Sequence, residues 1–138
     1  MPEPLIATLG APQWSGPETI LLVEDEALVR KAAAEVLESA GYKLMVAGNS
    51  SEALAACHRC FEPVDLLLAD VVMPGMNGLE LASEFERIYP RPRVLLMSGY
   101  TEQLASLATP HRNRYLAKPF STHTLLKRVR EVLDTTPI

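Results

Sequence analysis

The stretch TILLVEDE, Thr19 to Glu26, carries the pattern on which the prediction of the fold rests. Its first five residues, Thr19 to Val23, form an almost wholly apolar run of strand length, and three acidic residues follow without a break. A continuous apolar run of this length is typical of a strand buried on both faces, as in a parallel sheet. The stretch therefore predicts a central strand with carboxylates at its carboxyl end.

Outward from this stretch, short apolar runs alternate with segments of helical period along the chain. An alternation of this kind predicts a parallel sheet whose two faces are both covered by helices. We therefore expect an α/β domain with five strands, at Thr19–Val23, Lys43–Ala47, Val64–Ala69, Val94–Met97 and Tyr115–Ala117.

The segments between these strands carry helix signals. An apolar stripe over Val29–Ala40 ends at Gly41, a residue type common at helix C-termini. A fourth helix, within Thr101–Ala108, is expected to be short because Pro110 follows it. The third helix is expected to turn Leu81, Phe85 and Ile88 inward. The expected N-caps of the second, third and last helices are Asn49, Asn77 and Ser121, the first two with a glutamate three residues on.

Composition and charge limit the class of protein. The 138 residues match one domain of ordinary size, with 48% hydrophobic and 22% charged residues as in soluble globular proteins. A net charge of −4 argues against an electrostatic grip on nucleic acid. No apolar run reaches the roughly 20 residues of a membrane span, and the N-terminus lacks the basic residues of a secretory signal. We expect a cytoplasmic protein without membrane or nucleic-acid contacts.

The first residues differ in character from the rest of the chain. Residues 1–17 carry four prolines and show no amphipathic period. We expect them to form an N-terminal tail or linker, and residues 18–135 to form the folded domain.

Cys57 and Cys60 form a CxxC pair, which is compatible with a redox pair or half of a zinc site. A structural zinc ion needs four ligands, and only His58 stands nearby. Both thiols fall on the inward stripe of an expected helix, so we favour a structural role.

Acidic residues follow two of the expected strands. The first strand runs into Glu24, Asp25 and Glu26, and the third ends at Asp70. In a doubly wound sheet of order 2-1-3-4-5, the ligand site lies at the carboxyl ends between strands one and three. Two carboxylates at about 4 Å repel by about 4 kcal/mol at an intermediate dielectric, so the cluster favours a cation, magnesium or calcium. The alternatives are charges that complement a helix dipole and, for Asp70, an ordinary turn residue.

A hydroxyl and a cation complete this group of strand ends. Ser98 follows the fourth strand and Lys118 the fifth. Taken singly, such a serine is commonly an N-cap and such a lysine a solvated surface residue. Together with the acidic residues they provide what phosphoryl transfer needs: a carboxylate nucleophile, a metal ion and donors for phosphoryl oxygens.

Four stretches make the chain resemble the CheY-like receiver domains of two-component signal transduction. The resemblance spans Thr19 to Leu133 and implies a flavodoxin-like, doubly wound (βα)5 fold with a five-stranded parallel sheet in the order 2-1-3-4-5. It extends to the C-terminal receivers of hybrid sensor histidine kinases and to single-domain response regulators. The matching stretches are LLVEDE at 21–26, LLLADVVMPGMNG at 66–78, LLMSGY at 95–100 and YLAKPF at 115–120.

The resemblance implies a role for each matching residue of a metal site. Asp70 stands at the position of the phosphoacceptor, and Glu24 and Asp25 stand at the acidic pair that organises Mg²⁺. We expect Asp25 to bind the ion directly and Glu24 to bind it through water. The third protein ligand in the family is a main-chain carbonyl, which here belongs to Val72.

Three further positions match residues that act around the phosphoryl group. Ser98 is expected to bond a phosphoryl oxygen, and Lys118 to pair with the phosphate, with a cis peptide bond before Pro119. Tyr115 matches the switch aromatic, which in the family turns inward when the Ser98 hydroxyl moves toward the phosphoryl group. The alternative for Tyr115 is an ordinary strand aromatic with an exposed hydroxyl.

The resemblance also implies partners. A phosphohistidine on a histidine kinase or a histidine phosphotransfer protein would donate to Asp70, and an unknown downstream protein would meet the altered face of helix 4, strand 5 and helix 5. On this interpretation the chain is a signalling module rather than an enzyme. One alternative is a phosphohydrolase of the haloacid dehalogenase type, but Val72 occupies the place of its second aspartate. Another is a degenerate receiver that serves as a fixed binding module, although the acidic and basic residues are intact.

Overall fold

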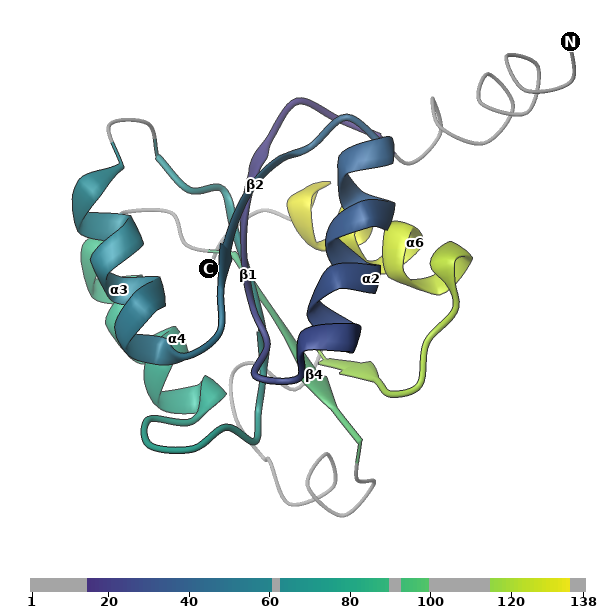
Figure 1. Cartoon of the computed structure of the whole chain (residues 1–138). Helices are drawn as coiled ribbons and strands as arrows, with labels where there is room; N and C mark the ends of the chain where they lie inside the picture. Colours follow the sequence, from purple (N-terminus) through teal and green to yellow (C-terminus); the bar gives the residue numbers. More distant parts are fainter. Residues whose placement is uncertain (1–14, 61–62, 90–92, 100–114, 135–138) are drawn as a thin grey trace, which may run out of the picture.

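The computed structural model describes residues 15–60, 63–89, 93–99 and 115–134, drawn as the coloured ribbon in Figure 1. The short helix expected within Thr101–Ala108 lies outside these residues. None of the helices in the described ranges has the length and apolar character that crossing a membrane needs. The elements in chain order are β1 (Thr19–Val23), α2 (Ala27–Ser39), β2 (Lys43–Ala47), α3 (Ser50–Arg59), β3 (Leu66–Asp70), α4 (Gly78–Ile88), β4 (Val94–Ser98), β5 (Tyr115–Ala117) and α6 (Thr122–Asp134).

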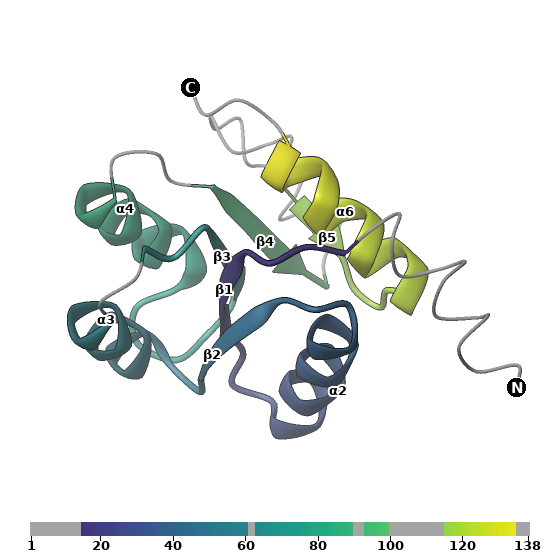
Figure 2. The same ribbon diagram turned by 90° about the horizontal axis from the view of Figure 1, so that it is seen from above.

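The five strands form one parallel sheet in the order β2-β1-β3-β4-β5. Helices α2 and α6 cover one face of the sheet, and α3 and α4 cover the other, as the two views in Figures 1 and 2 show. The predicted doubly wound architecture and strand order are confirmed. Because all strands run in the same direction, the residues that follow them meet at one rim of the sheet.

The central strands β1, β3 and β4 are buried over their whole length. Their side chains alternate between two cores. In β1, Ile20 and Leu22 pack beneath α2 and α6, whereas Leu21 and Val23 pack beneath α3 and α4. A strand covered on both faces has no polar side, which explains the almost unbroken apolar run at its position in the sequence.

Two strands differ from the sequence prediction at their ends. Strand β3 begins at Leu66 rather than Val64 and includes Asp70 as its last residue. The side chain of Asp65 accepts a hydrogen bond from the Thr19 main-chain nitrogen at 2.9 Å, so a carboxylate takes the place of a main-chain partner just before the strand. Strand β4 likewise extends by one residue, to Ser98. Asp70 and Ser98 therefore have main chains fixed by the sheet.

The helix starts follow the predicted capping residues, with one difference. Asn77 and Glu80 form a complete capping box at the start of α4. At the start of α3, the Asn49 side chain accepts from the Glu52 main-chain nitrogen, as predicted. The Glu52 carboxylate, however, accepts from the main-chain nitrogen of Gly48 rather than that of Asn49. At α3, therefore, the bond from the glutamate side chain goes to the residue before the N-cap instead of to the N-cap itself.

At the C-terminal ends of α2 and α4, one sequence prediction is confirmed and one is wrong. After α2, Gly41 has a φ of +96°, a left-handed conformation that glycine adopts without strain, as its place in the sequence predicted. At the end of α4, the prediction that Ile88 faces inward is wrong, because its exposed fraction is 36%. Tyr89 packs against Phe85 in its place, with ring centroids 4.8 Å apart.

The CxxC residues lie at the end of α3, and neither forms a disulfide. Cys57 is buried, and burial raises the pKa of its thiol. Cys60 is half-buried at the C-cap rather than on the inward stripe. Among the described residues, no group suited to a metal ion includes either cysteine. These features favour the predicted structural role.

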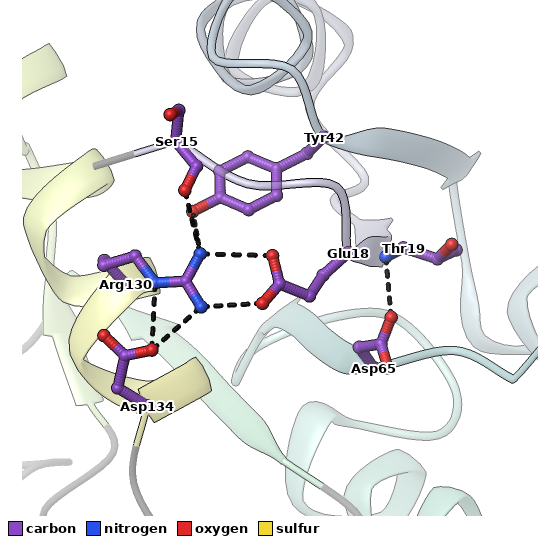
Figure 3. A network of polar contacts seen from close by, with 7 residues as sticks. All are labelled: Ser15, Glu18, Thr19, Tyr42, Asp65, Arg130 and Asp134. Carbon is purple, nitrogen blue, oxygen red and sulfur yellow. Dashed lines mark hydrogen bonds and ion pairs between the residues drawn. The ribbon is translucent and has the colours of Figure 1, made fainter. Parts of the chain in front are cut away.

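An arginine of α6 holds the segment that leads into β1 (Figure 3). Arg130 donates to the two carboxylate oxygens of Glu18 at 2.7 and 3.1 Å, and to the Ser15 carbonyl at 2.9 Å. It also bonds Asp134 at 2.9 Å, and it lies 3.5 Å from the Tyr42 hydroxyl. The network ties α6 to the residues before β1 and to the turn after α2. The predicted boundary between tail and domain, after residue 17, falls inside it.

Glu18→Gln is expected to lower the free energy of unfolding at neutral pH by about 1–3 kcal/mol, because a charge-assisted hydrogen-bond pair becomes a neutral contact. The Arg130 hydrogen bonds hold the pKa of Glu18 below its ordinary value of 4.5. The stabilisation is therefore present above that value and is lost as the pH falls through the lower pKa of the folded state. Urea unfolding at neutral pH and near about pH 3 measures both ends of this range.

The matched control is Glu131→Gln, which changes an exposed ion pair with Arg128 on the same helix. Its expected effect is below about 0.5 kcal/mol at both pH values. A loss of stability in Glu18→Gln that is the same at neutral and acid pH would contradict the electrostatic origin of the Arg130 network.

Candidate functional site

Carboxylates from two neighbouring strands lie together at the carboxyl-terminal rim of the sheet. Val23 of β1 is paired with Ala69 of β3, so Glu24 and Asp70 follow in matching positions. Oxygen atoms of Glu24, Asp25 and Asp70 lie within 4.8 Å of one another. The structure therefore brings together three acidic residues from two strand ends, Glu24 and Asp25 after β1 and Asp70 at the end of β3.

Lys118 connects two of these carboxylates. Its Nζ atom lies 2.7 Å from Oε1 of Glu24 and 2.9 Å from Oδ2 of Asp70. The lysine follows β5, and its main-chain nitrogen donates to the Ser98 carbonyl at the end of β4. The peptide bond between Lys118 and Pro119 is cis, as the sequence resemblance implied. One ammonium group thus serves two carboxylates from different strands.

Burial sets the electrostatics of this group. Glu24 has an exposed fraction of 0%, and burial raises the pKa of its carboxyl, although hydrogen bonds from Lys118 and the Glu26 main chain act in the opposite direction. Burial also opposes the charge on Lys118, but the bonds to Glu24 and Asp70 outweigh it and raise the pKa of the lysine. The rim carries three carboxyl groups against the ammonium group of Lys118 and the guanidinium group of Arg30, which bonds the Glu24 carbonyl, so acidic groups outnumber cations there.

A cavity of about 400 Å³ opens at this rim, lined by Asp25, Glu26, Asp70, Val72, Gly99 and Lys118. Within it, Asp70 is only 6% exposed, and its Oδ1 accepts from the Val72 main-chain nitrogen at 3.2 Å. Asp25 is exposed. Glu24 is not part of the lining; it is fully buried, and its side chain bonds Lys118. Of the acidic residues that follow these strands, Asp25, Glu26 and Asp70 line the cavity, whereas Glu24 and Asp70 bond the lysine.

Ser98 and Tyr115 lie on the neighbouring strands β4 and β5. Ser98 is 1% exposed and ends β4 beside Ala117. Tyr115 starts β5, and its hydroxyl oxygen is buried without a hydrogen-bond partner among the described residues. Its ring packs against the core that lies beneath α3 and α4.

Three residues that shape the rim were not predicted as part of the site. A Cβ atom at Gly78 would collide with the main-chain oxygen of Asp70, so only glycine lets α4 begin there. The Ser50 hydroxyl donates to the Met76 carbonyl at 2.8 Å and joins α3 to the loop after β3. Arg30 donates to the Glu24 carbonyl. The one signal for Arg30 was a cation near a helix N-terminus, where the helix dipole disfavours it.

Comparison with known proteins adds to this geometry. The response regulator receiver domain family matches residues 20–130. The chain belongs to this family. It is a receiver domain of two-component signal transduction, and the function predicted from the sequence is confirmed at this level.

The receiver is similar to proteins of two kinds. It is 36% identical over 126 residues to the sensor kinase CckA of Brucella abortus, and this match covers 90% of the chain but 13% of the kinase. It is 32% identical over 116 residues to the response regulator receiver protein CpdR of Brucella abortus, covering 83% of the chain and 95% of CpdR. Among solved structures, the chemotaxis response regulator CheY4 of Vibrio cholerae aligns with a TM-score of 0.74 at 27% identity, over 85% of the receiver and 99% of CheY4.

Lys118→Met is expected to lower the free energy of unfolding by about 1–3 kcal/mol without divalent cations, because the buried Glu24 carboxylate loses its cationic partner. Urea unfolding at neutral pH in the presence of a chelator measures this loss. Lys127→Met removes the same charge from an exposed position on α6 and is expected to stay within about 0.5 kcal/mol of wild type. Unchanged or increased stability in Lys118→Met would contradict the role given to this ion pair.

Proposed function

We propose that Asp70 accepts a phosphoryl group in a Mg²⁺-dependent reaction. The observation that carries this proposal is the Asp70 carboxylate itself: it faces a cavity beside Asp25 while Lys118 and the Val72 main chain hydrogen-bond its two oxygens. A nucleophile held in this way approaches the phosphorus atom with little loss of orientational freedom. Membership of the receiver family supports the same assignment.

The donor set at the rim fits Mg²⁺. It offers carboxylate oxygens within 4.8 Å of one another and, from the described residues, no histidine or cysteine ligand, a set typical of hard cations. We assign direct ligation to Asp25, Asp70 and the main-chain carbonyl of Val72. Glu24, which bonds Lys118 and does not line the cavity, would contribute through water. When bound, the ion neutralises charge on the carboxylates and on the phosphoryl oxygens.

In the proposed transfer, the bond between phosphorus and a histidine nitrogen of the donor breaks as a bond between phosphorus and an Asp70 oxygen forms. The nitrogen keeps the electron pair of the broken bond and takes up a proton. Lys118 remains beside the carboxylate and balances the charge that the phosphoryl group brings, about −1.5 to −2. Its hydrogen bond to Glu24 fixes the ammonium group at the rim.

We further propose that Ser98 and Tyr115 convert phosphorylation into a change of surface. Ser98 ends β4 next to the strand that leads to Lys118, within reach of the same rim. Movement of its hydroxyl toward a phosphoryl oxygen would alter the space into which the Tyr115 ring packs. The hydroxyl of Tyr115 has no hydrogen-bond partner among the described residues, so a shift of the ring would break no hydrogen bond to them.

The partners that we propose follow from this chemistry. The donor is a phosphohistidine on a histidine kinase or a histidine phosphotransfer protein, and the output passes to a downstream protein. The receiver is then a signalling module that assists its own phosphorylation, rather than an enzyme with a separate substrate. We infer in addition that its folded unit begins at about Ser15, since the Arg130 network includes that residue.

Incubation with acetyl phosphate tests the proposed chemistry directly. Wild type is expected to gain one phosphoryl group in the presence of Mg²⁺ and none after chelation, as measured by intact-protein mass spectrometry. The adduct should be stable to acid and labile to alkali, as an acyl phosphate is. Asp70→Asn should gain none, whereas the control Asp134→Asn, an exposed carboxylate on α6, should behave as wild type.

Two outcomes would contradict the proposal. Wild type that stays unmodified with Mg²⁺ would favour a degenerate receiver that acts as a fixed binding module. A phosphoryl group that persists in Asp70→Asn would place the acceptor elsewhere in the chain.

A further inference from the structure

A cation of α2 is bonded to the main chain at the acidic rim. Arg30 lies in the first turns of the helix, and its Nη1 donates to the carbonyl oxygen of Glu24 at 2.7 Å. That carbonyl belongs to the peptide unit that joins Glu24 to Asp25. The orientation of this peptide unit sets the direction in which the Asp25 side chain leaves the main chain. Arg30 therefore acts on the position of a carboxylate that it does not itself contact.

The other contacts of this turn come from Glu24. Its main-chain nitrogen donates to the Ala47 carbonyl at 3.1 Å, and its Oε2 accepts from the Glu26 nitrogen at 3.1 Å. Its Oε1 is bonded to Lys118. These contacts fix the main-chain nitrogen and the side chain of Glu24, but none of them involves its carbonyl oxygen. The Arg30 bond supplies the missing restraint on the peptide plane before Asp25.

Helix stability does not account for an arginine at this position. A cation near the N-terminus of a helix is unfavourable for the helix dipole. The N-cap residue Glu26 makes no side-chain capping bond, and the first turn of α2 has no acidic residue. The chain also leaves room for the guanidinium group: a Cβ at Gly48 would lie 3.3 Å from Nη1 of Arg30. Gly48, directly after β2, thus leaves space for the guanidinium group of Arg30 beside the turn that follows β1.

We propose that Arg30 is a positioning residue for Mg²⁺ binding, because it holds the peptide before Asp25 in the orientation that presents this carboxylate to the ion. The inference rests on the proposed metal site. The direction of the change in Mg²⁺ affinity on removing Arg30 distinguishes positioning from a simple charge effect. Removing a positive charge near a cation site strengthens cation binding by electrostatics alone, whereas loss of positioning weakens it.

Isothermal titration of Mg²⁺ into the unphosphorylated protein tests this inference. Arg30→Met is expected to raise the Mg²⁺ dissociation constant by about three- to tenfold. Without the Arg30 hydrogen bond, the peptide before Asp25 is less restrained, and part of the binding free energy must then be used to order it. Lys31→Met makes the same charge change at the next, exposed position and is expected to bind Mg²⁺ as wild type does, or slightly more tightly. Faster hydrogen exchange at the Asp25 and Glu26 amides should accompany the loss in Arg30→Met.

The phosphorylation rate separates positioning from a general loss of structure. With acetyl phosphate, Arg30→Met should need more Mg²⁺ to reach half of its maximal rate, while the rate at saturating Mg²⁺ stays within about twofold of wild type. Gly48→Ala keeps Arg30 and its charge but crowds the guanidinium group, and should weaken Mg²⁺ binding in the same direction by a smaller factor.

Unchanged or tighter Mg²⁺ binding in Arg30→Met would overturn the inference, even though wild type is phosphorylated normally. If Arg30→Met does not fold, Arg30→Gln decides, because its shorter, neutral side chain also loses the bond to the Glu24 carbonyl, and wild-type affinity there has the same meaning. Failure of wild type itself to bind Mg²⁺ or to accept a phosphoryl group would instead overturn the proposed function. The two failures are therefore distinguishable.

Discussion

The double ion pair of Lys118 with Glu24 and Asp70 is the interaction on which the rest of the site depends. Carboxylates so close together repel by several kcal/mol per pair at an intermediate dielectric, and burial of Glu24 adds the cost of desolvation. Lys118 offsets part of this, and Lys118 and Arg30 together are still fewer than the three carboxyl groups at the rim. The receiver therefore folds with a defined deficit of positive charge at the cavity that contains its nucleophile, and a divalent cation fits that deficit.

The sheet makes this arrangement possible because it fixes where each strand stops. Fully buried strands, covered on both faces, leave little freedom in register, and parallel pairing places Asp70 and Ser98 at the same rim. The loops beyond the rim are held by contacts that are not chemical participants. Gly78 lets α4 begin against the Asp70 carbonyl, Ser50 holds the loop after β3, and Arg30 holds the turn after β1.

Much of this arrangement could be predicted from local sequence. The apolar runs predict five strands, and the helical segments between them predict a sheet covered on both faces. The position of Asp70 at a strand end predicts the rim of the sheet at which the site lies. Local sequence was insufficient where several neighbouring residues, or several partners, compete for the same contact. Periodicity placed Ile88 in the core that Tyr89 fills, and residue spacing could not show that the Glu24 carboxylate turns to Lys118. The Arg130 network joins residues more than 100 positions apart, which no local pattern records.

The most direct test of the central claim is a Mg²⁺ titration followed by amide chemical shifts of the isotopically labelled protein. If the charge deficit at the rim forms the ion site, saturable shifts should be concentrated around Asp25, Asp70 and Lys118. The amides beside the Arg130 network, at the opposite end of the sheet, should not move. Shifts that are absent at saturating Mg²⁺, or that cluster away from the rim, would contradict this account.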